Sequence, residues 1–398
     1  MSNKLLKVLK IVSIICVVVL VIELIFLFYI SFFKNSKSIY FDGVNSLNTI
    51  SKGFITAGSN NDNDKYYEKA KITKYNLKME KEFEKLYNKG YNGVFFSVVE
   101  DVDGYIAVGS YEANEEEYNN STRSALIVKF DKNGEVIFEN NFQVLGNSKF
   151  VNVIVVDDGY LVVGQSVYEN MTLGTSNAGG AFLVKYNKSL KLEWKSNYGG
   201  NKSGIYNDLL VFNDYIYVVG KDFEKTGIIA KYDMDGNLIR SVTYEYTDSL
   251  GFSGIADING HIVVSGSKYI DDDNFKAMLV LYDGELNYVK DVNYDDDYSR
   301  FNNFVVDDNN DIVVIGMKRL NKKSAIDIFS YDGIIAKYDK NLVEIESLIY
   351  SNDSDDHFTD VKMVDNNYIV SGYSYYNDHG YMPKFIIYSK ALKVLEVK

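Results

Sequence analysis

Short apolar runs and polar turns alternate along the chain from about residue 40 to the end. A glycine closes one run in each repeat, after stretches such as Tyr-Leu-Val-Val, and it recurs at Gly58, Gly109, Gly164, Gly220, Gly266, Gly316 and Gly372. These seven glycines are 46 to 56 residues apart, which is close to the period of β-propeller blades. The pattern therefore predicts one repeat domain rather than several unrelated ones.

Each repeat contains four apolar runs in the same order. One run precedes the glycine-closed run, as at residues 95–100 and 301–306, and another follows it, as in ALIVKFD at 125–131 and GIIAKYD at 333–339. The polar links within a repeat are rich in Asn, Asp and Gly, the residues that tight hairpins need. We therefore expect an all-β fold, a seven-bladed β-propeller of four-stranded antiparallel blades, over residues 43–398.

The strands of a blade are labelled A to D in chain order. The A–B and C–D turns are short, whereas the B–C and D–A connections differ in length and composition, for example at residues 110–124, 165–180 and 317–332. Because each blade is an antiparallel meander, both kinds of variable connection lie on one face. Variable loops on a rigid scaffold often carry binding residues, so this variable face is the candidate for function.

The two ends of the repeat determine how the ring closes. The last run, residues 392–398, serves as strand D of blade 7, so the repeat begins with strand A and ends with strand D. No shared blade is therefore expected to join the ends. Residues 34–42 form either a short linker or an additional strand at the seam.

The first part of the chain has a different pattern. Residues 11–33 are almost all Ile, Val, Leu, Phe and Tyr, and they are long enough to cross a bilayer as one helix. Lys4, Lys7 and Lys10 precede them, so the positive-inside rule places residues 1–10 in the cytoplasm and the propeller outside. The run is longer than a signal-peptide core and lacks a small-residue cleavage site, which favours an uncleaved signal-anchor in the cell membrane.

Composition narrows the classes of ligand and chemistry. The net charge of -13 argues against nucleic acid, because phosphate binding needs clustered Lys and Arg. The single cysteine, Cys16, lies in the apolar N-terminal run, so neither a disulfide framework nor a cysteine metal site is expected. The sequence contains no nucleophile elbow, zinc-protease helix motif or phosphate-binding glycine loop. No catalytic residue is assigned.

The repeat also carries a family resemblance. Residues 182–200 read as an apolar strand, Lys-Tyr-Asn, a turn, Leu-Glu-Trp and Tyr-Gly-Gly, with Trp194 as the only tryptophan. This unit resembles those of bacterial β-propeller repeat proteins of the SBBP type. The resemblance covers about residues 40–398 and implies a surface or extracytoplasmic scaffold. Members of that family share an architecture rather than an activity, so the resemblance assigns no reaction.

Aromatic and acidic residues gather on the loops of the variable face. Tyrosine combines a broad apolar ring with a polar tip, which suits the binding of sugars or peptides. The predicted ligand-binding residues are Tyr111, Tyr168, Tyr269, Tyr298, Tyr373, Tyr376, Asp272 and Asp296. The alternative is a tyrosine-rich chain that shows its average composition on its loops. No cofactor is predicted; calcium is the ion that the acidic loops would suit, although none has the spacing of a known calcium loop.

The three histidines divide into two groups. His261 is assigned to the strand position that Tyr105, Tyr160 and Tyr368 occupy in other blades, which predicts a packing role. His357, His379 and Asp378 fall on the variable face of blade 7, and two imidazoles with a carboxylate could hold a transition metal. Separate loops need not converge, however, so the sequence favours the absence of a metal there.

Three functions remain open at this stage. The first is a membrane-anchored extracytoplasmic propeller that acts as a binding or interaction module for an unidentified protein or glycan at a bacterial cell surface. The second is an extracytoplasmic enzyme acting on carbohydrate or peptide with carboxylates of the variable face. The third is a structural subunit of a membrane complex, in which Glu23 of the apolar segment contacts a partner helix.

Overall fold

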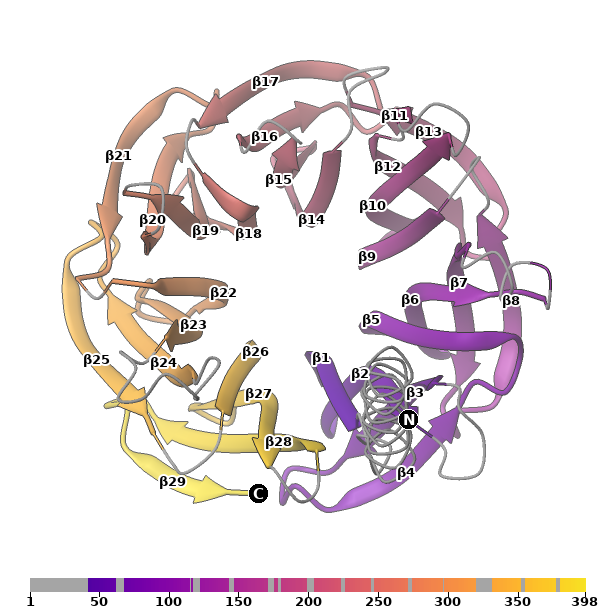
Figure 1. Ribbon diagram of the computed structural model, residues 1–398, viewed down its shortest axis with the longest axis horizontal. Helices are drawn as coiled ribbons and strands as arrows, with labels where there is room; N and C mark the ends of the chain where they lie inside the picture. Colours follow the sequence, from indigo (N-terminus) through magenta and orange to yellow (C-terminus); the bar gives the residue numbers. More distant parts are fainter. Residues whose placement is uncertain are drawn as a thin grey trace, which may run out of the picture. The chain divides into compact units, whose positions relative to one another are not determined.

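The seven repeats fold into seven antiparallel sheets that stand radially around a common centre in the computed structural model (Figure 1). The structure describes residues 42–398 except 62–67, 115, 117–121, 143–146, 171–174, 178–179, 199–203, 223–225, 245–246, 271–273, 296, 320–330, 352–354 and 377–379. The predicted signal-anchor, residues 11–33, lies outside this set. Within the set, no helix is both long and apolar enough to span a membrane.

The first three blades follow one another along the chain. Blade 1 consists of β1 (Asp42–Ile50), β2 (Gly53–Asn61), β3 (Glu68–Tyr75) and β4 (Lys81–Leu86). Blade 2 consists of β5 (Tyr91–Asp101), β6 (Gly104–Glu112), β7 (Ser124–Asp131) and β8 (Val136–Phe142). Blade 3 consists of β9 (Asn147–Val156), β10 (Gly159–Asn170), β12 (Ala181–Asn187) and β13 (Leu192–Asn197), with the short β11 (Thr175–Asn177) paired to the end of β10.

The other four blades repeat this order. Blade 4 consists of β14 (Gly204–Phe212), β15 (Tyr215–Asp222), β16 (Gly227–Tyr232) and β17 (Leu238–Tyr244). Blade 5 consists of β18 (Thr247–Ile258), β19 (His261–Tyr269), β20 (Phe275–Asp283) and β21 (Tyr288–Asn293). Blade 6 consists of β22 (Ser299–Val306), β23 (Ile312–Arg319), β24 (Tyr331–Tyr338) and β25 (Glu344–Tyr350). Blade 7 consists of β26 (Asp355–Val364), β27 (Asn367–Tyr376), β28 (Gly380–Ser389) and β29 (Val394–Val397).

The predicted fold is confirmed, and so is the absence of a shared blade. All four strands of blade 1 come from the start of the described chain, and all four strands of blade 7 come from its end. Strand A is innermost in every blade and strand D is outermost, so β1 and β26 lie side by side where the ring closes (Figure 1). The N-terminal residues 34–41, one reading of which was a strand at this seam, lie outside the described residues.

The register glycines have a structural cause. Strand A of every blade contains a β-bulge, and the residue before the bulge pairs with the register glycine, as Phe301 does with Gly316. The bulge pushes a backbone carbonyl of strand A over the glycine. A Cβ on Gly316 would lie 1.8 Å from the carbonyl oxygen of Arg300, and one on Gly220 would lie 1.9 Å from that of Ile205. Any side chain at these positions would therefore displace strand A.

The hairpin turns also match their predicted chemistry. In the A–B turns, Asn213, Asp214 and Asn259 have φ angles of 51°, 60° and 50°, the left-handed region that Asn and Asp tolerate. In the C–D turns, an Asp or Asn side chain accepts hydrogen bonds from the backbone two and four residues later; Asp283, for example, binds the N–H groups of Glu285 and Asn287. These short turns form the face opposite the variable one.

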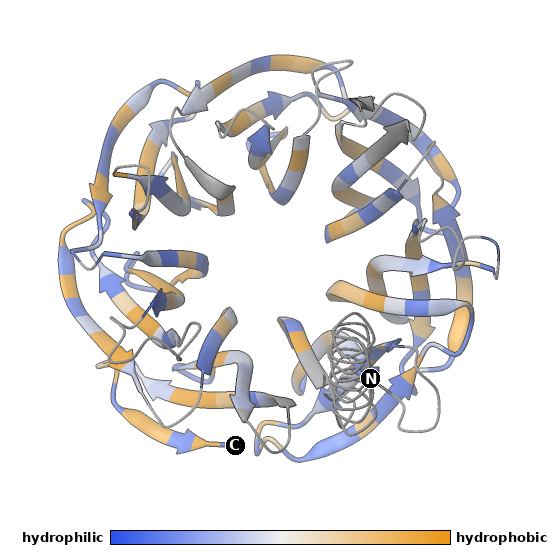
Figure 2. Ribbon diagram, in the orientation of Figure 1, coloured by the Kyte–Doolittle hydropathy of each residue, from blue (hydrophilic) through white to orange (hydrophobic). Residues whose placement is uncertain are grey.

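The hydrophobic core lies between the blades. Seven clusters of buried apolar side chains each join two neighbouring blades. Successive side chains of a strand point to opposite faces of its sheet, and each face packs against one neighbouring blade. Apolar and polar residues alternate along the strands accordingly (Figure 2). Leu190, Leu286 and Leu392 adopt left-handed φ angles in C–D turns and are almost fully buried, so packing into the core offsets the backbone strain.

Polar contacts near the A–B turns add to these interfaces. Tyr368 donates a hydrogen bond of 2.6 Å to Asp307 of the preceding blade, and the Lys337 ammonium lies 3.3 Å from the same carboxylate. Tyr160, Asp101 and Lys129 repeat this arrangement between blades 3 and 2. The lysine that recurs before Tyr or Phe in strand C is therefore a structural residue in these two blades.

The predicted packing role of His261 is wrong. His261 is exposed and begins β19, whereas Ile262 pairs with Tyr282 in the way that Tyr105 pairs with Phe130. The assignment was displaced by one residue, and in a strand a shift of one residue moves a side chain to the other face.

Candidate functional site

The tyrosines predicted from the sequence occupy different environments. Tyr111 is 8% exposed and packs edge-to-face against Tyr87 in the core between blades 1 and 2. Tyr269, Tyr298 and Tyr373 are partly exposed at the variable face. Tyr168 and Tyr376 lie at the ends of β10 and β27. Asp272, Asp296, Asp378 and His379 lie outside the described residues.

Two of these tyrosines belong to a larger aromatic group on blades 5 and 6. The ring of Phe275 packs edge-to-face against Tyr269 and Tyr298, with centroid distances of 6.4 and 6.1 Å. The guanidinium carbon of Arg300 lies 5.0 Å from the Phe275 centroid, and that of Arg319 lies 5.4 Å from the Tyr298 centroid. Stacking of this kind holds a guanidinium in place by cation–π attraction.

The group continues onto blade 7 through His357. Its imidazole stacks on Tyr373 at 4.9 Å and contacts the ring of Tyr331 at 5.0 Å. Burial lowers the pKa of His357 to about 4; Asp356 opposes this effect and Arg300 reinforces it. The imidazole is therefore neutral at neutral pH. Tyr269, Phe275, Tyr298, Arg300, Arg319, Tyr331, His357 and Tyr373 are called the aromatic arc, and all eight side chains are partly exposed.

No metal cluster accompanies His357. In the described part of the chain, no group of three or more His, Cys, Asp or Glu side chains is placed to hold a metal ion. The two other residues of the predicted metal site, His379 and Asp378, are outside that part.

Three carboxylates lie beneath the arc between blades 6 and 7. Asp356 is fully buried, accepts a hydrogen bond from Ser374 and lies 3.3 Å from the Lys384 ammonium. Asp332 is 2% exposed, and burial together with repulsion from Asp356 raises the pKa of its carboxyl group. Burial also raises the pKa of Asp355. One paired carboxylate and two carboxyl groups with raised pKa values therefore lie side by side.

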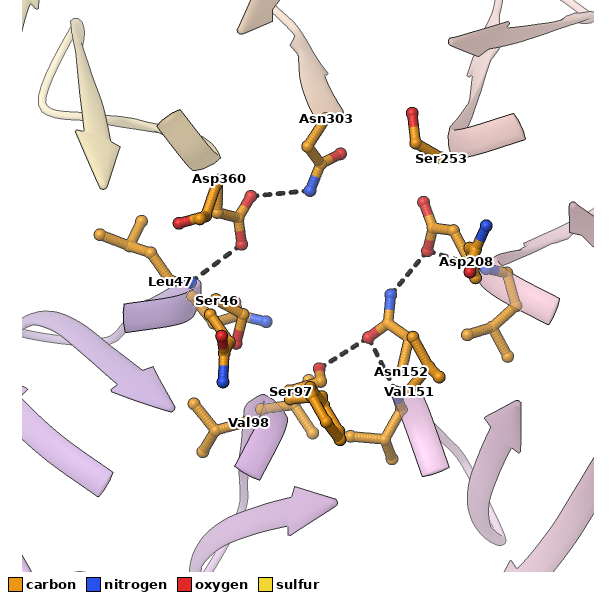
Figure 3. Close-up of a pocket in the computed structure, with 18 of the residues that line it drawn as sticks. Ser46, Leu47, Ser97, Val98, Val151, Asn152, Asp208, Ser253, Asn303 and Asp360 are labelled. Carbon is orange, nitrogen blue, oxygen red and sulfur yellow. Dashed lines mark hydrogen bonds between the residues drawn. The ribbon is translucent and has the colours of Figure 1, made fainter. Parts of the chain in front are cut away.

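A separate cavity of about 420 Å³ lies at the centre of the ring, between the strands A of all seven blades. Because strand A bulges, two successive side chains line this central channel in six blades, and Ser253 alone does so beside Gly254 in blade 5. Most of them are polar. Figure 3 shows Ser97, Asn152, Asp208, Asn303 and Asp360 converging on the cavity from five different blades.

The bulge residues form a ring of hydrogen bonds between blades. In five blades the bulge side chain donates to the carbonyl of the residue before the bulge in the next blade. The donor and acceptor pairs are Asn45 and Phe95 at 2.9 Å, Asn207 and Phe252 at 2.7 Å, Ser253 and Phe301 at 2.7 Å, Asn302 and Phe358 at 2.7 Å, and Thr359 and Val44 at 2.9 Å. The last pair closes the ring across the seam. Phe96 and Val151 are apolar at this position.

The residues that follow the bulges form two hydrogen-bonded chains. Ser97 donates to Asn152, and Asn152 donates to Asp208, each at 2.6 Å. Asn303 donates to Asp360 at 2.8 Å. Both aspartates end their chains, because the next blades carry the small residues Gly254 and Ser46 at the equivalent positions.

Each terminal aspartate instead accepts from the backbone of the next blade. The N–H of Ile255 donates to Asp208 at 3.0 Å, and the N–H of Leu47 donates to Asp360 at 2.9 Å. Both aspartates therefore link two blades by side-chain to backbone hydrogen bonds. Figure 3 shows the bond between Leu47 and Asp360.

The two aspartates differ in electrostatic environment. The Lys362 ammonium lies 3.3 Å from Asp360. Asp208 accepts from Asn152 and from the backbone of Leu209 and Ile255, all of them neutral groups. Burial raises the pKa of Asp208 to about 6, although these hydrogen bonds and the more distant Lys362 oppose the shift. Its carboxylate is thus the less stabilised of the two charges.

The sequence analysis missed the central channel. Its signal is a repeated pattern in strand A, an aromatic or Val residue followed by one variable residue and then Asn, Asp, Ser or Gly, as in Phe-Asn-Asn at 301–303 and Phe-Thr-Asp at 358–360. Two adjacent polar residues inside a buried strand break the alternation of period two. Such a break indicates a bulge, and in a propeller it points to the centre.

Comparison with known proteins shows the fold alone. No family model and no curated protein match the chain. The solved structure of Sqt1 from Chaetomium thermophilum aligns with a TM-score of 0.52 at 10% identity, covering 90% of this chain and 88% of that one.

Two other solved structures align similarly. The polysaccharide lyase Uly1 has a TM-score of 0.50 at 8% identity, covering 87% of this chain and 89% of its own. Cobalt-substituted ACO from Synechocystis has a TM-score of 0.50 at 10% identity, covering 91% and 93%. At such low identity these similarities concern architecture and transfer no activity. The chain is a seven-bladed β-propeller, a fold that commonly serves as a binding or interaction module.

Proposed function

We propose that the protein is a binding module that a bacterial cell displays outside its membrane, and that the aromatic arc contacts the ligand. The observation that carries this proposal is the arc itself. Tyr298 and Phe275 on neighbouring blades hold two guanidinium groups at the variable face, in a chain whose net charge is -13. Arginines stacked on partly exposed aromatic rings are typical of recognition surfaces.

The proposed location depends on the N-terminal segment. The apolar run at residues 11–33 would tether the propeller to the cell membrane, and the lysines before it favour a cytoplasmic N-terminus. The resemblance of residues 182–200 to SBBP-type repeats agrees with a surface scaffold.

The chemistry of the arc favours a glycan over the other candidate ligands. Aromatic rings stack on the apolar faces of sugars, and guanidinium groups donate two parallel hydrogen bonds to a carboxylate. Nucleic acid is disfavoured because its binding needs many clustered Lys and Arg, whereas the arc holds two guanidinium groups, which suit separate carboxylates. We therefore propose a surface glycan that carries carboxylate groups as the ligand, with a surface protein as the alternative.

A binding experiment tests this assignment. The full-length protein in detergent would be applied to an array of neutral and acidic glycans, with and without calcium. Tyr298→Ala and Arg319→Ala are each expected to weaken binding by about tenfold or more. Tyr288→Ala is the matched control, because Tyr288 is 57% exposed on an outermost strand away from the arc. Equal binding by all three variants would contradict the proposal.

A second candidate function is hydrolysis or elimination on a polysaccharide. The observation that favours it is the group of carboxylates under the arc, in which Asp332 and Asp355 have raised pKa values and Asp356 is paired with Lys384. A carboxyl group with a raised pKa can act as a general acid. Release of reducing ends from an array-positive glycan, lost in Asp332→Asn, would support an enzyme. Binding of the glycan without release of reducing ends would instead support the binding function.

A further inference from the structure

We propose that the central channel is a second binding site and that it takes a small organic cation, an amine held against Asp208. This site is separate from the aromatic arc: it is built from strands A in the interior of the ring, and its ligand is a small solute rather than a surface polymer.

The size of the channel indicates an organic solute. Its volume of about 420 Å³ is within the range of about 300 to 1,000 Å³ that is typical of small-molecule sites. A bare metal ion would leave most of this space empty. The described residues also contain no metal-ligating cluster, here or elsewhere.

The charges that line the channel favour a cation. The charged residues in the lining are two carboxylates, Asp208 and Asp360, and one ammonium, Lys362. That ammonium forms an ion pair with Asp360. Within the described part of the chain, Asp208 makes no ion pair. The Asp208 side chain is partly exposed where it lines the cavity. Its carboxylate has only neutral hydrogen-bond donors, and a cation placed in the cavity beside it would compensate the charge.

The remaining polar groups favour a ligand that donates hydrogen bonds. The side-chain donors that surround Asp208 are engaged, since Asn152 donates to Asp208 and Asn207 donates to the Phe252 carbonyl. An ammonium group can donate hydrogen bonds to the Asp208 carboxylate, whereas a carboxylate ligand would be repelled by it.

The apolar part of the lining suits the carbon atoms of an amine. Phe96, Val98 and Val151 line the cavity together with Ser97 and Asn152, the chain that ends at Asp208 (Figure 3). The Lys149 ammonium already lies 5.3 Å from the centroid of the Phe96 ring, so this ring contributes apolar area to the lining. The cationic end of the ligand would therefore lie at Asp208 and its alkyl part against blades 2 and 3.

Binding should depend on pH through Asp208. The groups that face this carboxylate are the Asn152 amide, the N–H groups of Leu209 and Ile255, and, at longer range, Lys362 with its partner Asp360. The pKa of Asp208 is about 6. At pH 7.5 the carboxylate is ionised and binds a cation, whereas at pH 5 most of it is protonated.

Isothermal titration of the full-length protein in detergent with choline and with putrescine tests the site. We expect saturable binding of at least one of them at pH 7.5 and about tenfold weaker binding at pH 5. Asp208→Asn should abolish binding, and Asp214→Asn, in an exposed turn of the same blade, should leave it unchanged. The proposal would be overturned if neither choline nor putrescine bound, or if Asp208→Asn left binding unaffected.

Two further variants separate binding from folding. Val151→Phe would fill the channel with the side chain that blade 2 already carries at this position, and it should abolish binding without altering a charge. Lys362→Met removes the competing ammonium and should tighten binding about threefold or more. Calcium that displaces the amine stoichiometrically would assign the channel to an inorganic ion and overturn the organic-cation proposal.

Discussion

The seam between blades 7 and 1 and the interface between blades 2 and 3 join equivalent sheets by different means. Among the described residues, the interface between blades 2 and 3 has a core of fourteen buried hydrophobic side chains, from Val99 to Leu190, whereas the seam has six. At the channel the order is reversed. The seam has hydrogen bonds from Thr359 to Val44 and from Leu47 to Asp360, whereas blade 2 places the apolar Phe96 at the equivalent bulge.

This difference shows how a propeller can close without a shared blade. In a shared blade, the first and last strands of the chain pair in one sheet. Among the described residues, blades 7 and 1 instead meet through side-chain packing and side-chain to backbone hydrogen bonds. Burial of large apolar side chains contributes about 1.5–3 kcal/mol each, and a buried hydrogen bond contributes about 1 kcal/mol net. The seam therefore depends on fewer and more individually important contacts.

The largest expected effect is at Phe385, the aromatic centre of the seam. Its ring packs against Phe54 and Tyr75 at centroid distances of 5.7 and 5.2 Å. Phe385→Ala should lower the free energy of unfolding by about 3–5 kcal/mol, the usual result for a buried Phe. Because the seam has little else, hydrogen exchange of β1, β2 and β28 should also accelerate before that of the other blades.

Phe182 provides the control for this prediction. It is 1% exposed and packs against Phe142 and Phe150 at 5.4 and 5.7 Å in the larger core. Phe182→Ala should cost a similar amount in urea unfolding, but the rest of the cluster should keep blades 2 and 3 together. If both variants change exchange uniformly around the ring, the seam is not the weaker junction.

The next effect compares the two channel aspartates. Asp360→Ala removes the acceptor for the N–H groups of Leu47 and Val361 and for the Asn303 amide, and we expect a loss of about 3 kcal/mol. Asp208→Ala removes an equivalent set of hydrogen bonds, but it also removes a carboxylate charge that makes no ion pair with any described residue. It should therefore cost about 1 kcal/mol less at pH 7.5. If both variants lose the same free energy of unfolding in urea, the ion pair between Lys362 and Asp360 does not stabilise the folded protein.

The fold could be predicted from the sequence because its main constraint is local. A glycine must stand where the bulge of strand A places a carbonyl, and this requirement repeats in every blade, as at Gly220 and Gly316. The glycine positions therefore predicted the number and spacing of the blades, although the sequence analysis did not identify the bulge. One reading that depended on finer register, the position of His261, was displaced by a single residue.

The sites were harder to predict because they depend on contacts between blades. Tyr111 and Tyr269 both follow a register glycine in strand B, yet Tyr111 lies in a core and Tyr269 is partly exposed. Tyr111 packs against Tyr87 of the preceding blade, whereas Tyr269 packs against Phe275 of its own blade. The channel was missed for a different reason: Asn302 and Asn303 point to the same cavity only because the strand bulges, and alternation alone assigns one of them to the opposite face.

A smaller effect concerns the pH dependence of stability. The pKa of Asp208 is about 6 in the folded protein and about 3.8 in the unfolded chain, so the folded state binds more protons between these values. The contribution of Asp208 to stability is therefore greatest below about pH 4 and is lost as pH rises through 6. After allowance for solvent screening we expect about 2 kcal/mol.

The difference in unfolding free energy between the wild type and Asp208→Asn isolates this effect, because shifts at other carboxylates cancel. Measured at pH 4.5 and pH 7.5, the difference should favour the wild type more at the lower pH. A difference that is independent of pH would contradict the assignment of the raised pKa to Asp208.

The smallest effect tests whether the bulge ring itself closes the seam. Thr359→Val keeps the shape of the side chain but removes the hydroxyl that donates to the Val44 carbonyl, and it should cost about 1 kcal/mol. The reverse change is available at blade 3, where Val151 occupies the same bulge position. In Val151→Thr the new hydroxyl can reach the Tyr206 carbonyl, the equivalent acceptor in blade 4, and should stabilise the protein by about 0.5–1 kcal/mol.

These two substitutions exchange a methyl group and a hydroxyl group in opposite directions. One is at the seam, and the other is at an interface between two blades that follow one another in the chain. If the hydrogen bonds of the bulge residues stabilise every interface between blades equally, the two changes in the midpoint of urea unfolding should be opposite in sign and similar in size. If it acts mainly where no large apolar core is present, the loss at Thr359 should exceed the gain at Val151. Destabilisation by both substitutions would mean that each bulge is packed for its own residue, and the hydrogen bonds would then have no separate role in closure.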